Sequence, residues 1–141
     1  MNSIPELNKY LECEINKLNC EFPKYEEITA GLFQKVYDFL SVDFENLSDN
    51  HVYRYFLVSF KEIICYAFDR DVSKAYLRFF FKIMNKEIIV GYIANKAKSR
   101  AKDIKNIMDR FLHFFKTSWQ GYYDDKDRVL GEIISLIDYW M

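Results

Sequence analysis

Side chains that commonly perform catalysis or bind metal ions are few in this chain, and their spacing brings none of them together. The two histidines, His51 and His113, lie far apart in the sequence, and neither belongs to an HExxH pattern. The three cysteines are Cys13, Cys20 and Cys65, and they form no CxxC pair. Because a metal site needs several such donors converging at helical or turn spacings, the sequence predicts no metal site.

The patterns that activate a nucleophile or cradle a phosphate group are missing as well. No serine stands in a GxSxG turn, and no cysteine has the local sequence of a cysteine hydrolase. The glycines Gly31, Gly91, Gly121 and Gly131 occur singly, and three of them lie inside helical patterns. Phosphate-binding loops need clustered glycines at a helix N-terminus. We therefore expect no enzyme activity and no cofactor, and we expect the helical glycines to allow close packing or a bend.

Charge is unevenly distributed along a chain whose formal net charge is only −1. Residues 1–50 contain 4 basic and 10 acidic side chains, whereas residues 74–116 contain 11 basic and 3 acidic ones. Charges separated in this way can form two surfaces that attract different partners. They can equally belong to two parts of one helical bundle that attract each other.

The densest basic stretch is a candidate surface for an anionic partner. It comprises Lys96, Lys98, Arg100, Lys102 and Lys105. On one continuous helix, Lys98, Lys102 and Lys105 would share a face. The stretch is either the solvated side of an amphipathic helix or a binding surface for nucleic acid, an acidic protein or an anionic membrane. The small net charge and the lack of a helix-turn-helix pattern make nucleic acid a less favoured partner than protein.

A second candidate contact surface combines aromatic and acidic side chains in a segment with the composition of a loop. It comprises Trp119, Tyr122, Tyr123, Asp124 and Asp125. Tyrosine and tryptophan beside polar loop residues are typical of protein-binding surfaces. The aromatic residues can instead cover one end of a helical bundle, and the two aspartates can instead open a helix, where negative charge is favourable.

Apolar residues recur at steps of three and four along most of the chain, which predicts helices. The helix between residues 48 and 68 is apolar nearly all round, so we expect it to lie at the centre of the fold. Residues 87–116 form either one long helix or two helices that break near Ser99. The expected helices run from Ser3 to about Cys20, from about Tyr25 to Leu40, from Ser48 or Asp49 to Phe68, from Asp71 or Ser73 to Asn85, and from Glu87 to about Lys116. A last helix begins at Asp125.

Composition supports the same fold class. The 141 residues include 50% hydrophobic side chains but only 4 Gly and 2 Pro, too few turn residues for many short strands. We expect an all-α protein, a single compact bundle of six or seven helices that spans residues 1–141. No secretory signal or transmembrane run is visible, and an odd number of cysteines suits a reducing compartment. The expected location is therefore the cytoplasm.

These observations together predict a non-catalytic protein that works by binding another protein. The chain is small, partly acidic and rich in Phe, Tyr, Ile, Lys and Asn, and in this composition it resembles bacterial toxin-neutralising immunity proteins. The resemblance implies an inhibitor or antitoxin whose acidic face binds a basic, nuclease-type toxin domain. The residues expected to form that face are Glu12, Glu14, Glu21, Glu26, Glu27, Asp38, Asp43, Glu45 and Asp49.

Two other functions are alternatives. One is a nucleic-acid-associated helical protein that uses the basic stretch at 96–105, and its binding should weaken steeply with salt. The other is a virus-encoded helical decoy, similar to the Bcl-2 type, that binds a partner helix in an apolar groove. The chain lacks the NWGR-like motif that this second similarity would imply.

Overall fold

The computed structural model describes residues 4–117 and 126–141, which form seven α-helices and two short 3-10 helices. The prediction of an all-α bundle is confirmed. None of the helices in these ranges combines the length and the hydropathy that crossing a membrane requires. In chain order the elements are α1 (Ile4–Glu21), η1 (Pro23–Tyr25), α2 (Glu26–Leu40), α3 (Asp49–Asp69), α4 (Lys74–Met84), α5 (Glu87–Ala97), η2 (Lys98–Arg100), α6 (Ala101–Thr117) and α7 (Lys126–Trp140).

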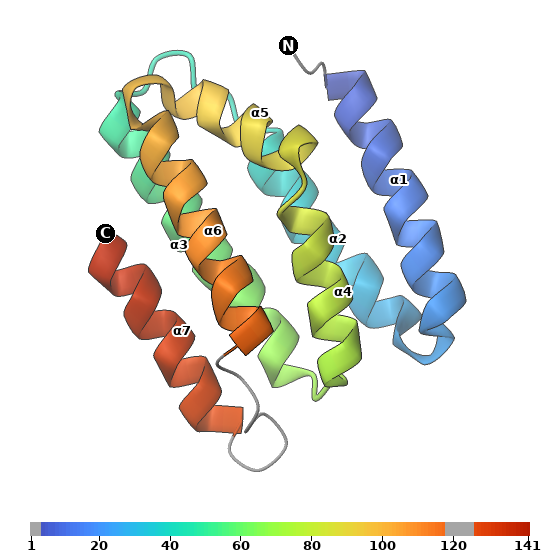
Figure 1. Cartoon of the computed structure of the whole chain (residues 1–141). Coiled ribbons are helices and arrows are strands. Elements are labelled where there is room, and N and C mark those ends of the chain that lie inside the picture. The colour runs from blue at the N-terminus through green and yellow to red at the C-terminus, as the bar shows by residue number, and fades with distance from the viewer. Residues whose placement is uncertain (1–3, 118–125) are drawn as a thin grey trace.

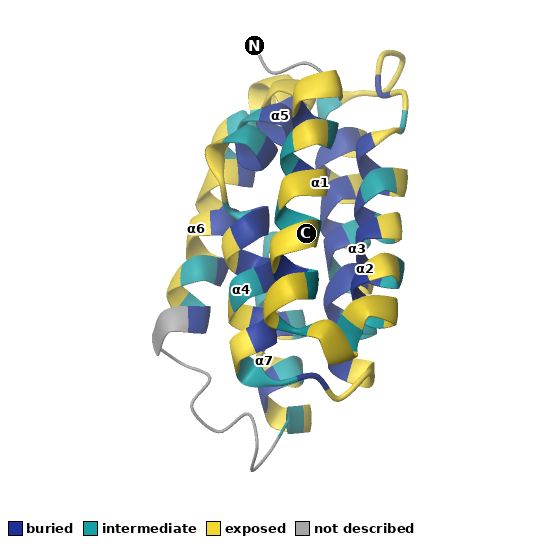
Figure 2. Ribbon diagram, turned by 90° about the vertical axis from the view of Figure 1, so that its right-hand side faces the viewer, coloured by how far each residue is buried: buried dark blue, intermediate teal, exposed yellow. Residues whose placement is uncertain are grey.

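The helices form two layers with covered edges. Helices α2 and α3 make one layer, and α4 and α6 make the other, with α5 across one end (Figure 1). Helices α1 and α7 lie at the two opposite edges (Figure 1). Helix α3 packs against α2, α5, α7 and η2, so the predicted central element is central in the structure. Figure 2 shows the buried positions turned inward and the exposed positions outward along the helices.

Local sequence signals explain where several helices begin and end. Ser48 and Ser73 are the N-caps of α3 and α4, and each hydroxyl oxygen accepts a hydrogen bond of 3.2 Å from the backbone N–H three residues later. Such caps satisfy N–H groups that have no partner within the helix. Asn85 is the C-cap of α4, as its position in the pattern predicts. The sequence allowed Ser48 or Asp49 as the N-cap of α3 and Asp71 or Ser73 as the N-cap of α4. In both cases the serine is the N-cap.

The helical pattern at residues 87–116 is interrupted, which decides between the two alternatives. Lys98 has φ 51° and ψ −105°, a backbone region that residues with a Cβ rarely occupy. The chain passes through η2 and continues as α6, which packs against α5 (Figure 1). Two helices therefore replace the single long one that the apolar periodicity also allowed.

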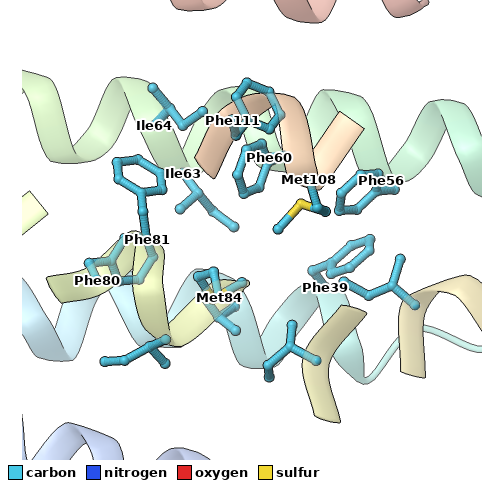
Figure 3. Close-up of a cluster of buried hydrophobic side chains, with 14 of the residues drawn as sticks. Phe39, Phe56, Phe60, Ile63, Ile64, Phe80, Phe81, Met84, Met108 and Phe111 are labelled. Carbon is cyan, nitrogen blue, oxygen red and sulfur yellow. The ribbon is translucent and has the colours of Figure 1, made fainter. Parts of the chain in front are cut away.

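The buried residues form one cluster to which all seven α-helices contribute. Aromatic rings make up much of it, as the close-up in Figure 3 shows for Phe60, Phe81 and Phe111. The ring centroids of Phe60 and Phe111 are 4.7 Å apart, and those of Phe81 and Phe115 are 3.9 Å apart. Burial of such large apolar side chains is the main favourable contribution to folding. The assignment of residues 1–141 to one domain stays a prediction.

Tyrosine hydroxyl groups join helices that are distant in the sequence. A buried hydroxyl needs a hydrogen-bond partner, because leaving it unpaired costs about 1–3 kcal/mol. In this structure the partners are mostly backbone carbonyls on other helices. The bonds are Tyr10 to the Ile83 carbonyl at 3.2 Å, Tyr53 to the Trp140 carbonyl at 2.8 Å, Tyr92 to the Leu40 carbonyl at 3.2 Å, and the pair of Thr29 and Tyr76 hydroxyls at 2.7 Å.

Gly31 allows α2 and α3 to approach closely. A Cβ atom at this position would overlap the hydroxyl oxygen of Tyr66 and would lie 2.8 Å from its ring carbon Cζ. At Gly131 in α7, by contrast, nothing lies within 4 Å of the same atom. The packing role expected for the helical glycines is therefore found at Gly31 and not at Gly131.

This contrast predicts opposite effects of the same substitution. Gly31→Ala should lower the free energy of unfolding by about 1–3 kcal/mol through overpacking. Gly131→Ala should raise it by about 0.5–1 kcal/mol, because alanine loses less backbone entropy in a helix. Urea unfolding measures both values. A Gly31→Ala protein as stable as the original would show that the close approach is not required, and Tyr66→Leu in the same chain should restore part of the loss.

The buried tyrosines predict a loss of stability at alkaline pH. Burial raises the pKa of the Tyr10, Tyr76 and Tyr92 hydroxyls above the usual 10.0. Because the folded state holds these protons more tightly than the unfolded state, their contribution is complete below a pH of about 10 and is lost as the pH rises through the raised pKa values. Urea titrations at increasing pH should show this decline. Tyr76→Phe should make it shallower, and an unchanged slope would contradict the assignment.

Candidate functional site

The histidines and cysteines, which are the side chains most often used in catalysis, are distributed over α1, α3 and α6. His51 lies in the first turn of α3, where its ring is bonded to the N-cap serine of that helix, and His113 is exposed on α6. Cys13 and Cys20 are exposed on α1. Burial raises the pKa of the half-buried Cys65 thiol, which keeps it in the less reactive protonated form. In residues 4–117 and 126–141, no three His, Cys, Asp or Glu side chains are grouped so as to hold a metal ion.

The nine acidic residues predicted to bind a partner do not form one continuous surface. Glu21, Glu26 and Glu27 are exposed around the turn from α1 to α2. Asp43 and Glu45 are exposed in the loop that follows the other end of α2. The 15 residues of α2 hold the two groups about 22 Å apart, at 1.5 Å per residue. A single small partner domain would therefore contact one group more closely than the other.

Three further members of the set lie along the helices between these ends. Glu14 is bonded to Lys17 at 3.1 Å, on the side of α1 that faces the hollow next to α4. Glu12, two residues earlier, is on the opposite flank of α1, because successive helical residues are about 100° apart. Asp38 is exposed near the end of α2 and accepts a hydrogen bond of 2.8 Å from Gln34.

The ninth residue, Asp49, has a structural role. Its Oδ2 accepts hydrogen bonds from the backbone N–H of Ser99 at 3.2 Å and from the Ser99 hydroxyl at 2.5 Å. These hydrogen bonds hold the pKa of Asp49 below its usual range. The carboxylate thus joins the first turn of α3 to η2, directly beside the unusual backbone of Lys98.

The basic stretch at 96–105 is divided by η2, the short helix between α5 and α6. Lys96 is at the end of α5 and Lys98 is in η2, whereas Lys102 and Lys105 are exposed on α6. Lys98 would share a face with Lys102 and Lys105 only on a continuous helix. Because the helix breaks at η2, this condition is not met. The five cations therefore follow a bend rather than one helical face.

Arg100, the fifth member of the basic stretch, is held by contacts within the protein. Its Nε lies 2.6 Å from the carboxylate of Asp103, and its guanidinium also donates to the side-chain oxygen of Asn50 at 2.7 Å. The guanidinium carbon is 3.8 Å from the centre of the Tyr53 ring. A planar cation that is paired and stacked in this way is well placed to fix helix packing.

The aromatic and acidic candidates Trp119, Tyr122, Tyr123, Asp124 and Asp125 lie outside the described residues. Their role as a second contact surface stays a prediction.

One exposed surface combines apolar and acidic side chains on the layer of α2 and α3. Tyr55 and Val58 are 39% and 45% exposed, and Leu47, in the loop before α3, is 41% exposed. Three residues of spacing places Tyr55 and Val58 on the same side of α3. The Tyr55 ring is stacked on Phe39 at 5.6 Å, which fixes its position. Tyr55 and Val58 together provide an apolar centre that solvent reaches, and Leu47 adds an exposed apolar side chain in the preceding loop.

Acidic side chains lie beside Tyr55, whereas the exposed cation Arg54 is four residues before Val58 on the same side of α3. Asp38 and Glu62 line a hollow of about 110 Å³ together with Tyr55. Asp43 and Glu45 flank Phe44, whose ring centroid is 5.6 Å from that of Tyr55. Lys35 also lines the hollow, and its ammonium lies 5.3 Å from the Tyr66 ring. We call the following seven residues the acidic–apolar patch: Asp38, Asp43, Glu45, Leu47, Tyr55, Val58 and Glu62.

The sequence identified only the acids Asp38, Asp43 and Glu45 of this patch. Tyr55 and Val58 belong to a helix that is apolar nearly all round, so the pattern does not separate exposed apolar positions from buried ones. The one available signal is that Glu62 is seven residues after Tyr55, on the same side of the helix. Which side of α3 stays uncovered depends on where the other helices pack.

Comparison of the chain with protein-family models, with curated proteins and with solved structures finds no match. Its function must therefore be inferred from the surfaces of the molecule.

The role of Asp49 can be tested apart from any partner. Asp49→Ala removes both acceptors for Ser99, so the Ser99 amide proton should exchange with solvent faster, and the urea midpoint should fall. Asp43→Ala removes an exposed carboxylate that accepts only a local bond from the Glu45 amide, and both quantities should stay close to their original values. Equal effects of the two substitutions would show that Asp49 does not hold the junction.

Proposed function

We propose that this chain is a non-catalytic protein-binding domain that recognises a basic partner through the acidic–apolar patch. The observation that carries the proposal is that the exposed side chains of Tyr55 and Val58 lie on one side of α3, with the carboxylates of Asp38 and Glu62 beside Tyr55. Exposed tyrosine is enriched among the residues that dominate binding energy at protein interfaces. A surrounding rim of charge is the usual anatomy of such interfaces.

The charge of the rim supports a basic partner. The carboxylates of Asp38 and Glu62 line the hollow beside Tyr55 together with Lys35, and those of Asp43 and Glu45 are exposed in the nearby loop on either side of Phe44, whose ring contacts Tyr55. Complementary charge of this kind mainly speeds association and rejects partners with the same sign. The exposed acids at the other end of α2 add to the negative potential of this side at longer range.

The proposed partner class is a basic, nuclease-type toxin domain, and the chain would act as its inhibitor or immunity protein. A protein of this kind needs no catalytic group, since it acts by occupying its partner's surface. Support comes from the composition, from the negative charge of residues 1–50, and from a patch that is built mainly on two packed helices and can bind without large rearrangement.

The first experiment identifies the partner and measures its binding. The purified chain is used to capture a partner from the cells that carry its gene, and surface plasmon resonance then follows the purified pair. Tyr55→Ala should weaken the affinity by about 30-fold or more, as expected for a residue at the centre of an interface. The double variant Asp38→Lys, Glu62→Lys should slow association by about tenfold at low salt and by less at high salt.

A matched control separates local recognition from overall charge. Glu26→Lys with Glu27→Lys makes the same change in net charge at the other end of α2, and it should change the association rate far less. A larger effect at Glu26 and Glu27 than at Asp38 and Glu62 would overturn the assignment to the patch. An acidic captured partner, or no captured partner, would overturn the proposed recognition of a basic protein.

The inhibitory role has its own readout. Expression of the captured partner alone should slow cell growth, and co-expression of the chain should restore it, whereas the Tyr55→Ala chain should restore it less. A partner that is harmless when expressed alone would contradict the toxin-neutralising role while leaving the binding role to the affinity data.

A further inference from the structure

A pocket lies between α4 and α6, in the layer opposite the acidic–apolar patch. Its volume is about 280 Å³, and its apolar walls come from Phe81, Leu112 and Phe115. The walls are rigid, because the Phe81 and Phe115 rings are buried and stacked at 3.9 Å. Small-molecule sites are typically concave, mostly apolar and lined by a few polar groups, with volumes from about 300 Å³ upward. This pocket suits a small ligand with an apolar body.

The polar groups at this pocket are cationic. Arg78, Lys82 and Lys86 follow one another at four-residue steps and all line the pocket. Like charges at this spacing repel each other. Among the described residues that line the pocket there is no acidic side chain. Lys82 and Lys86 are exposed, and neither forms an ion pair with another described residue.

The same two lysines also line a second hollow on the other side of α4, where Glu14 and Lys17 are found. Glu14 is bonded to Lys17 at 3.1 Å, so the acid that lines this hollow already has a cationic partner. The positive charge of Lys82 and Lys86 is therefore left to the solvent or to a ligand.

Asn85 provides a further polar group in the pocket. Its side-chain oxygen Oδ1 is buried and has no hydrogen-bond partner in the described structure. An unpaired buried amide is unfavourable. The side-chain amide also carries N–H groups, and these can donate hydrogen bonds to an anion in the pocket.

The geometry points to a binding site for a small anionic amphiphile, a molecule with an apolar chain and a single carboxylate or phosphate group. The apolar chain would lie against Phe81, Leu112 and Phe115, and the anionic group would lie between Lys82, Lys86 and the amide of Asn85. This site is separate from the acidic–apolar patch, and it does not depend on the proposed recognition of a basic protein.

The test uses the full chain and defined probes. Binding of decanoate and decyl phosphate, below their micelle-forming concentrations, is measured by calorimetry and by amide chemical shifts of Phe81, Leu112 and Phe115. Both anions should bind about tenfold or more tightly than decanol, since hydrogen bonds to charged groups add to apolar burial. Decylamine should bind no better than decanol. Equal binding of anion, alcohol and amine, or no binding at millimolar concentration, would overturn the proposal.

Two variants separate the cationic and apolar parts of the site. Lys82→Glu with Lys86→Glu should weaken decanoate binding at least tenfold and leave decanol binding little changed. Leu112→Trp should fill the pocket and weaken both ligands. The matched control, Lys102→Glu with Lys105→Glu, changes the same net charge at exposed positions of α6 outside the pocket and should leave decanoate binding unchanged. Circular dichroism checks the fold of each variant.

Further measurements distinguish a free small ligand from a membrane lipid and from a protein partner. Binding of decanoate as a free monomer supports a soluble amphiphile. Binding to phosphatidylglycerol vesicles without binding to either monomeric anion would instead indicate a membrane surface and would overturn the small-ligand site. An Asp- and Glu-rich peptide with one Phe that displaces decanoate at a lower concentration would assign the pocket to a protein partner and would overturn it as well. Tyr55→Ala should not affect any of these measurements.

Discussion

The burial of α3 is the constraint on which the rest of the structure depends. This helix is packed by α2, α5, α7 and η2, and Phe56, Phe60 and Phe68 on it are almost completely buried. A helix this apolar must be covered on most sides, because each exposed large apolar side chain gives up about 1.5–3 kcal/mol of favourable transfer energy. What the neighbours leave uncovered is a narrow strip that contains Tyr55, Val58 and Glu62. The candidate docking surface is thus a direct consequence of how the core is covered.

The connection between α5 and α6 is the second determinant, because it sets the position of the helices that cover α3. Lys98 adopts a backbone conformation with φ 51°, and such a conformation persists when surrounding contacts hold it. Asp49 and Arg100 supply those contacts, through Ser99 on one side and Asn50 on the other. Asp49 and Arg100, which the sequence pattern assigned to partner binding, therefore stabilise the fold.

The two candidate sites lie on different layers and differ in the sign of their charge. The acidic–apolar patch is on α2, α3 and the loop between them, and the pocket with Lys82 and Lys86 is between α4 and α6 (Figure 1). The acids of the patch and the cations of the pocket thus lie on opposite layers of the bundle. The proposed protein partner and the proposed small anion would need different residues, so the two proposals do not compete for the same surface.

The sequence by itself determined the all-helical fold and the central place of α3, and it narrowed the N-caps of α3 and α4 to two residues each, because apolar periodicity and helix caps act over a few residues. It also indicated the separation of charge. It could not determine which acids lie together, since the distance between Glu27 and Asp43 depends on the direction of α2 and of its neighbours. The break at Lys98, the structural use of Asp49 and Arg100, and the exposure of Tyr55 were decided by tertiary structure. Each depends on contacts between residues far apart in the chain, and such contacts leave no local pattern in a single sequence.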